Sequence, residues 1–154
     1  MNLPLVAPAI PSSTEVLRHT AFFRELAPTQ LERIAIICRV ESYPRDASIY
    51  TLGQAADDLY VLVDGMVRFT IGMGSRSTQG GQVLKRGEVF GWAALVESAQ
   101  TRIATALAIT PCMVLAMNGE QLSIMMDEDH TLGYRLVRQL NELITGNLTA
   151  FASG

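Results

Sequence analysis

The residues whose types and spacing best suit ligand binding lie in one stretch, GEVFGWAALVESAQTRIATA, at positions 87–106. A short helix beginning near Gly91 would present unpaired backbone N–H groups at its N-terminus, and the helix dipole adds to their positive potential. Gly91 and the alanines after Trp92 leave space for an anion to approach. The stretch therefore predicts an anion site.

Arg102, near the end of the same stretch, is the side chain best suited to hold that anion. Its guanidinium is permanently charged and forked, so it can donate paired hydrogen bonds to an oxyanion in a geometry that lysine cannot copy. The alternative is a structural ion pair at the start of a strand, for instance with Glu97. The residue types alone leave both readings open.

Helical patterns flank this region at the two ends of the chain. Ser13 or Thr14 can cap EVLRHTAFFREL, and Pro28 at a first helical position opens TQLERIAIICRV. Towards the C-terminus, Asn118 can cap GEQLSIMMDE, and a last helix is expected over TLGYRLVRQLNELITGNLTAF.

Strand patterns fill the middle of the chain, from Arg39 to Met117, with the spacing of a sandwich or barrel. The clearest predicted hairpin is DLYVLVDGMVRFT, with its turn at Asp64-Gly65. A second hairpin is expected across GMGSRSTQGG, whose glycines suggest a mobile loop and not a nucleotide fingerprint, because no helix pattern follows them.

Length and charge restrict the classes of protein. The 154 residues fit one domain, which we place at residues 14–154, after an extended arm at residues 1–13 that is broken by prolines. The formal net charge of −3 makes nucleic acid and membrane surfaces poor partners. No apolar run is long enough to span a bilayer.

The metal-binding and catalytic residue types are sparse. Cys38 and Cys112 are interpreted as reduced thiols of a cytoplasmic protein. A metal-dependent cupin would need several histidines on its inner strands, whereas His19 and His130 both fall in helical segments. We find no catalytic constellation, so we expect no enzyme, no metal site and no cofactor.

Taken together, these motifs resemble the cyclic nucleotide-binding domain, over about Val16 to Phe151. The first half, GQAADDLYVLVDGMVRF, is similar to the family's turn glycine, acidic pair and Tyr-containing strand; the matching residues are Gly53, Asp58, Leu59, Tyr60 and Gly65. The second half is similar to the family's phosphate-binding cassette, and its matching residues are Phe90, Gly91, Trp92, Ala93, Ala94, Leu95, Arg102, Ile103 and Ala104.

The resemblance implies a mainly β fold, a double-stranded β-helix or jelly-roll of about eight strands, with short N-terminal helices and a long C-terminal helix. It also implies a non-enzymatic sensory or regulatory module that binds a cyclic nucleotide or a related small anion between Gly91 and Arg102. The alternative is a degenerate domain that serves as a dimerisation or docking platform and binds no small molecule.

Two positions of the cassette depart from the family. Trp92 stands where the family has a Glu that binds the ribose hydroxyl, and Ile103 stands where a hydroxyl side chain binds the phosphate. Losing both contacts would weaken a site of ~1 μM by roughly two to four powers of ten, if the losses add. We therefore expect weak binding of cAMP and cGMP, with Trp92 acting either as an apolar plug or as a stacking platform.

The C-terminal helix carries two apolar stripes, which suggest a parallel homodimer. One consists of Leu136, Leu140, Leu143 and Asn147, and the other of Val137, Ile144, Leu148 and Phe151. The alternative is that the whole apolar surface folds back onto its own domain.

Overall fold

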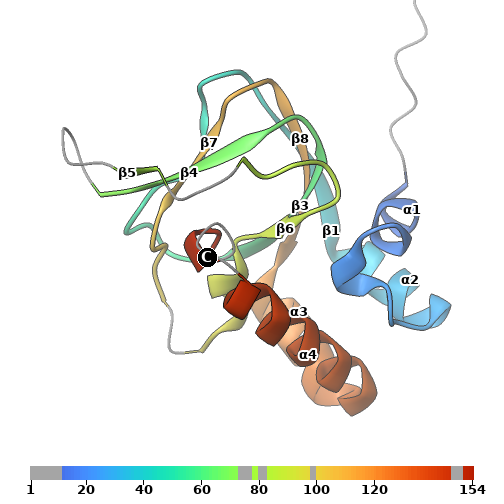
Figure 1. The fold of residues 1–154 in the computed structure, drawn as a ribbon. Coiled ribbons are helices and arrows are strands. Elements are labelled where there is room, and N and C mark those ends of the chain that lie inside the picture. The colour runs from blue at the N-terminus through green and yellow to red at the C-terminus, as the bar shows by residue number, and fades with distance from the viewer. Residues whose placement is uncertain (1–11, 73–77, 80–82, 98–99, 147–150) are drawn as a thin grey trace, which may run out of the picture.

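The computed structural model describes residues 12–72, 78–79, 83–97, 100–146 and 151–154. Two antiparallel four-stranded sheets form the centre, with helices before and after them in the sequence (Figure 1). The mainly β jelly-roll fold is thereby confirmed. The first sheet has the order β1 (Cys38–Tyr43), β8 (Cys112–Asn118), β3 (Asp58–Asp64) and β6 (Val89–Phe90). The second has the order β2 (Ser48–Tyr50), β7 (Thr105–Ala108), β4 (Val67–Ile71) and β5 (Thr78–Gln79).

The N-terminal helices are α1 (Ser13–Arg18), the 3₁₀ turn η1 (Ala21–Phe23) and α2 (Pro28–Ile37). Pro28 opens α2 as predicted. The predicted cap of α1 is wrong, because the N-cap is Ser12, whose side chain accepts from the Glu15 N–H. The helix also ends earlier than predicted. Near its end the Thr20 hydroxyl bonds the Val16 carbonyl at 2.7 Å, a side-chain bond that competes with continued helix.

Strand β3 explains how one apolar run serves two cores. Leu59 and Val61 point into the cluster between the first sheet and the helices, whereas Tyr60 and Leu62 point into the cluster between the two sheets. Successive side chains of a strand face opposite sides, so a strand covered on both faces reads as continuously apolar.

The hairpin predicted across Asp64-Gly65 is wrong in its pairing. β3 pairs with β6 and β8, and β4 pairs with β5 and β7, so the turn carries the chain from one sheet to the other. Gly65 has φ 99°, and a Cβ there would lie 2.5 Å from the Pro111 carbonyl oxygen. Glycine is therefore needed at this turn, where the chain passes from one sheet to the other close to the Pro111 backbone. The second hairpin is confirmed in part: the chain returns antiparallel to β4, but β5 lies inside the segment predicted as the loop, and the predicted return strand QVLKRG contributes the bridge from Leu84 to Val67. The loop glycines Gly74, Gly80 and Gly81 lie outside the described residues.

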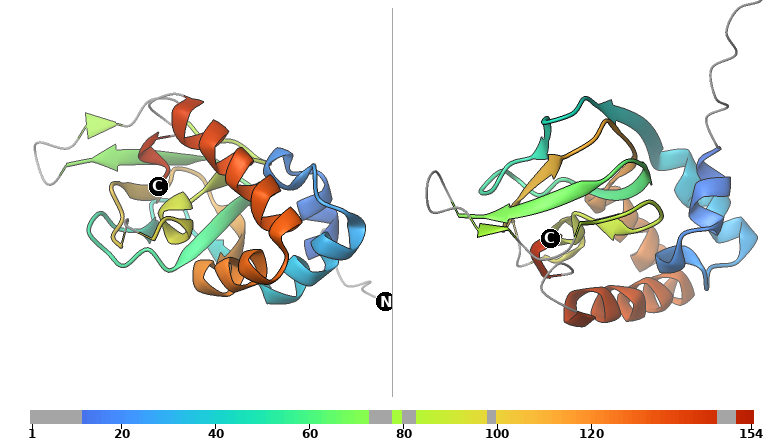
Figure 2. Two further views of the ribbon diagram at one scale, coloured as in Figure 1. Left: turned by 90° about the horizontal axis from the view of Figure 1, so that it is seen from below. Right: turned by 45° about the horizontal axis from the view of Figure 1, so that its top comes forward.

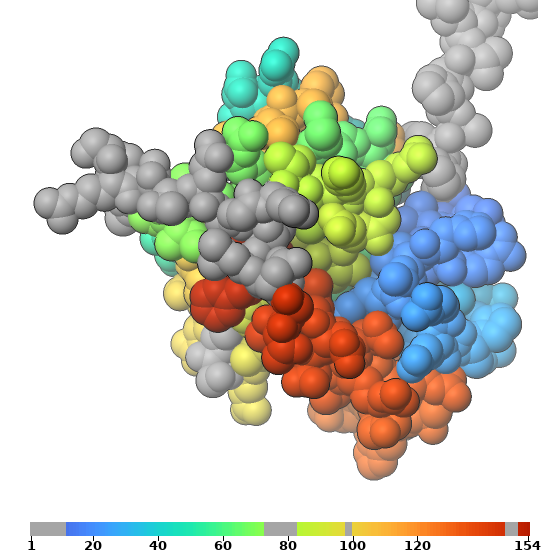
Figure 3. Space-filling model, in the orientation of Figure 1, coloured from blue at the N-terminus to red at the C-terminus, as the bar shows by residue number. Residues whose placement is uncertain are grey.

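The C-terminal helices are α3 (Gly119–Glu128) and α4 (His130–Gly146). Asn118 caps α3 as predicted, accepting from the Gln121 N–H at 2.9 Å. Helix α4 lies beside the N-terminal helices, as the red-orange and blue atoms show in Figure 3. Leu136 is fully buried, and Leu140, Leu143 and Ile144 pack against the helix-side cluster. Val137 and Tyr134 remain exposed.

Candidate anion-binding site

The centre of the site is a tight turn between β6 and the 3₁₀ helix η3 (Trp92–Leu95). Gly91 caps η3 in the left-handed conformation, with φ 77°. A Cβ at this position would lie 2.9 Å from the Asp58 carbonyl oxygen and 3.1 Å from a guanidinium nitrogen of Arg102. Only glycine gives both the backbone conformation and the close approach.

Arg102 faces this turn from just before β7. Its backbone is fixed by the chain at Gly53 and Gln54: its N–H donates to the Gln54 carbonyl at 2.8 Å, and its carbonyl accepts from the Gly53 N–H at 2.9 Å. The side chain is 3% exposed. Its guanidinium donates to the carbonyl oxygens of Gly91 at 2.9 Å and Asp58 at 2.6 Å.

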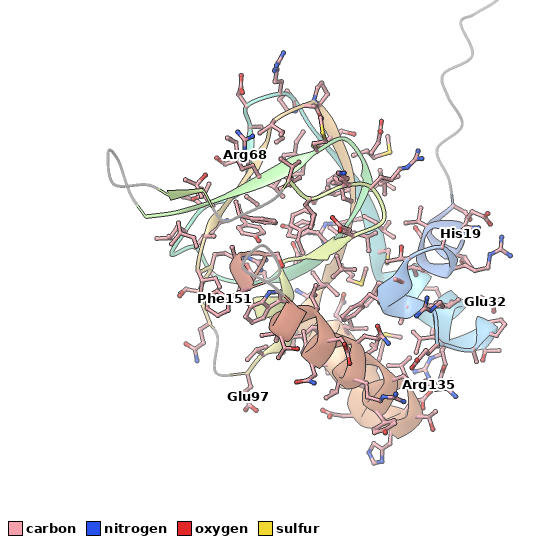
Figure 4. All side chains as sticks on the ribbon, viewed as in Figure 1. His19, Glu32, Arg68, Glu97, Arg135 and Phe151 are labelled. Carbon is pink, nitrogen blue, oxygen red and sulfur yellow. The ribbon has the colours of Figure 1, made fainter. Side chains whose placement is uncertain are left out.

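No Asp or Glu side chain of the described residues forms an ion pair with Arg102. Glu97 is exposed and extends away from the barrel (Figure 4), so the predicted alternative of an Arg102–Glu97 pair is wrong. The Asp58 carboxylate pairs instead with Arg39. The buried Nε of Arg102 has no hydrogen-bond partner in the described part of the chain. A buried guanidinium with no Asp or Glu carboxylate beside it, and with one donor unused, is an uncommon arrangement.

Aromatic rings surround the guanidinium. Arg102 lies 4.1 Å from the ring centre of Tyr50 and 5.8 Å from that of Tyr60, within the range of cation–π attraction. Phe90 stacks on Tyr60 with ring centres 5.0 Å apart. Burial raises the pKa of Tyr60 to about 12 and raises the pKa of Tyr50 as well, against the opposing effect of the nearby Arg102 charge. Both phenols are therefore neutral at physiological pH.

The last described residues of the chain lie at this site. The Ser153 carbonyl oxygen accepts from the Gly91 N–H and, at 3.1 Å, from the Tyr50 hydroxyl. The Gly154 backbone oxygen accepts from the Arg102 guanidinium at 2.9 Å. Figures 1 and 2 both show the C-terminal end beside the η3 turn. The donors predicted to face an anion thus face backbone oxygens of the chain itself.

The Trp92 indole lies against the C-terminal residues Phe151 and Gly154. The indole is 6% exposed, and its ring centre lies 6.4 Å from that of Phe151. Gly154 lies between the indole and Arg102, and a Cβ on Gly154 would come within 2.7 Å of the indole ring.

The other predicted site residues lie around the turn but differ in their surroundings. Phe90 and Ala104 are fully buried in the cluster between the sheets, and Ala93 is buried in the helix-side cluster. Ala94 is half-buried beside Gly119, where a Cβ would meet the Ala94 carbonyl oxygen. Leu95 and Ile103 pack against the helix-side cluster.

Sequence reasoning did not find two contributors, Tyr50 and the segment Phe151–Gly154. Tyr50 lies 52 residues before Arg102 on a three-residue strand, so no local spacing links the two. The signal for the C-terminal segment was its composition, since Ala-Ser-Gly offers a small, accessible backbone.

The family assignment agrees with this geometry. Residues 40–129 match the family model of the cyclic nucleotide-binding domain, and the chain belongs to that family. No curated protein matches the chain by sequence.

Solved structures give the same fold. A candidate cyclic nucleotide-binding protein from Geobacter metallireducens GS-15 is 28% identical, with a TM-score of 0.77 over 88% of this chain and 98% of that one. The sensor domain of the transcriptional regulator DNR from Pseudomonas aeruginosa is 18% identical, with a TM-score of 0.71 over 86% and 94%. The regulatory domain of Toxoplasma gondii PKA, crystallised with cAMP, is 20% identical, with a TM-score of 0.71 over 84% of this chain and 49% of that one.

These comparisons confirm the predicted family, the cyclic nucleotide-binding domain, and its fold. Within the described residues, no helix has the length and apolar character needed to cross a membrane.

Proposed function

We propose that the chain is a non-enzymatic sensory module of the cytoplasm, and that its cassette binds a small anionic ligand of the cyclic nucleotide type. Arg102 and the Gly91 N–H are the anion donors. Trp92 and Ile103 take the places of a carboxylate and a hydroxyl, so cAMP and cGMP bind weakly.

The observation that carries this proposal is the state of Arg102. It is buried, pairs with no Asp or Glu side chain of the described residues, and keeps an unused Nε donor while another of its nitrogens donates to the Gly91 carbonyl oxygen. Burying a guanidinium with no acidic side chain to pair with it is costly, and a bound anion would reduce that cost. A domain kept only as a docking platform has no need for such a residue, which favours the sensor over the platform.

The test is a double substitution that restores the two missing contacts. Trp92→Glu with Ile103→Ser should raise cAMP affinity by at least about tenfold, or about 1.4 kcal/mol. This is less than the sum of two charged hydrogen bonds, because neighbouring substitutions couple. Isothermal titration calorimetry measures the affinity, and adding Arg102→Ala should abolish the gain.

The control is the thermal unfolding of each variant, which separates a lost contact from a lost fold. A well-folded double variant with no gain in cAMP affinity would show that the pocket differs from the family in more than two side chains. The docking platform would then be the better account.

A further inference from the structure

The C-terminal segment Phe151–Gly154 occupies the position that the anion needs. Ala152 and Ser153 are completely buried, although they lie at the end of the described chain. Ala152 belongs to the cluster between the two sheets, which also contains Tyr50 and Phe90. A segment that only trailed over the surface would not be buried in this way.

Three donors from three separate elements converge on two consecutive backbone oxygens. The Gly91 N–H and the Tyr50 hydroxyl donate to Ser153, and Arg102 donates to Gly154. Gly91 precedes η3, Tyr50 ends β2, and Arg102 precedes β7. This arrangement places acceptor oxygens where an oxyanion would present its own.

The fit of the segment is steric as well as polar. Gly154 lies so close to the Trp92 indole that a Cβ would approach two ring carbons to 2.7 Å. The Phe151 ring lies near the same indole, with the two rings inclined at 53°, and Phe151 (labelled in Figure 4) stays half exposed. Trp92, one of the two cassette positions that depart from the family, therefore forms the surface against which the segment packs.

We propose that Phe151–Gly154 is an internal ligand of the cassette and competes with the anion for Gly91 and Arg102. The inference rests on the proposed function, because competition requires that the cassette bind an anion. The segment offers two backbone oxygens and leaves the Arg102 Nε unused, whereas an oxyanion brings further acceptor oxygens that can also reach this donor. An anion of sufficient affinity therefore displaces the segment, and the segment sets the concentration at which the module responds.

The first test measures the position of the segment without any ligand. Ala152→Arg cannot be accommodated at a fully buried position, and Gly154→Leu collides with Trp92, so both variants should expel the segment. Trp92 is the only tryptophan, so acrylamide quenching of its fluorescence reports the change. We expect the quenching constant to rise in both variants. The matched control is Ala21→Arg, which adds the same charge at an exposed position of η1 and should leave the quenching unchanged.

The second test measures competition, using inorganic phosphate and cAMP as the probes in calorimetric titrations. Both expelled variants should bind at least one probe about tenfold more tightly than the parent, because occupation of the site lowers the apparent affinity by the fraction of open molecules. Arg102→Gln added to either variant should remove the gain. The acetylated peptide Phe-Ala-Ser-Gly, added in excess to an expelled variant, should lower the quenching towards the parent value.

The outcomes separate this inference from the proposed function. Unchanged quenching in both folded variants overturns the internal ligand. Raised quenching with an unchanged, measurable anion affinity overturns the competition. Raised quenching with no anion binding in any variant supports the position of the segment and overturns the proposed function instead.

Discussion

At the residue scale, Gly91 is the position where both the backbone conformation and the packing of the site depend on the absence of a Cβ atom. Gly91→Ala places a residue with a Cβ at φ 77°, which costs roughly 1–2 kcal/mol by itself. The new Cβ would also lie 2.9 Å from the Asp58 carbonyl oxygen, one of the acceptors of Arg102. We expect a total loss of about 2 kcal/mol or more in the free energy of unfolding.

Chemical denaturation measures this loss. Gly53→Ala is the matched control, because Gly53 has φ 84° but open space around its Cβ position. Gly53→Ala should lower the free energy of unfolding only by the cost of placing a residue with a Cβ in the left-handed conformation, roughly 1–2 kcal/mol. Equal losses in the two variants would contradict the close approach between the turn and Asp58.

The meeting of Gly91 and Arg102 could be predicted from the sequence, because the two residues stand at the spacing of the family's cassette. The hydrogen-bond partners of the Arg102 side chain could not be predicted from the sequence. They are backbone oxygens of Gly91, Asp58 and Gly154, and every residue carries a backbone oxygen, so the sequence does not indicate which of them Arg102 will use. The same reason explains why the occupation of the site by Ser153 and Gly154 was not predicted.

At the element scale, Asp129 joins three helices. It ends α3, and one carboxylate oxygen accepts from the Leu132 N–H in the first turn of α4 at 3.2 Å. The other accepts from the side chain of Gln30, in α2, at 3.1 Å. The Gln30 amide, first, and the Leu132 N–H lower the pKa of Asp129 below its ordinary value. The charged form is therefore stabilised by folding.

This shift gives a pH dependence with a definite sign. Because the folded-state pKa is lowered, the stabilising effect is complete above the unfolded pKa of about 4 and is lost as the pH falls through the lower folded value. The difference in unfolding free energy between the parent and Asp129→Asn should favour the parent at pH 6 and shrink at pH 3. Denaturant titrations at the two pH values measure it, and a difference that does not change with pH would contradict the role of the charge.

Element boundaries followed the sequence where a local signal sets them, as at Pro28 and Asn118. The structure departs from the sequence-based prediction where tertiary packing, and not a local signal, determines the strand pairing. The turn at Asp64-Gly65 has the composition of a hairpin, but the strands on either side are each paired in different sheets. Composition specifies that the chain turns there; the packing of the two sheets decides with which strand it pairs.

At the scale of the whole molecule, the homodimer through α4 stays a prediction. The structure divides the two predicted stripes differently: Ile144 packs with the first stripe against the core, and the exposed apolar surface of α4 is formed by Tyr134 and Val137. Leu148 and Asn147 lie outside the described residues. If this surface associates, Val137→Glu should convert dimer to monomer without loss of helix content.

Sedimentation velocity at high micromolar concentration measures the association, and circular dichroism provides the control for the fold. Thr145→Glu is a matched variant, because it adds the same charge at an exposed position of the same helix. A parent protein that sediments only as monomer would contradict the dimer.

The central claim is that Arg102 holds an anion, and its unused Nε–H reports on that claim directly. In ¹H–¹⁵N NMR spectra of labelled protein, the Arg102 Nε–H signal can be assigned by its absence in Arg102→Lys. Titration of the parent and of Ala152→Arg with inorganic phosphate, cAMP and cGMP should shift this signal saturably with at least one of them, and slow its exchange with water, because the donor gains an acceptor. A signal that stays unchanged with all three anions, in both proteins, would contradict the account.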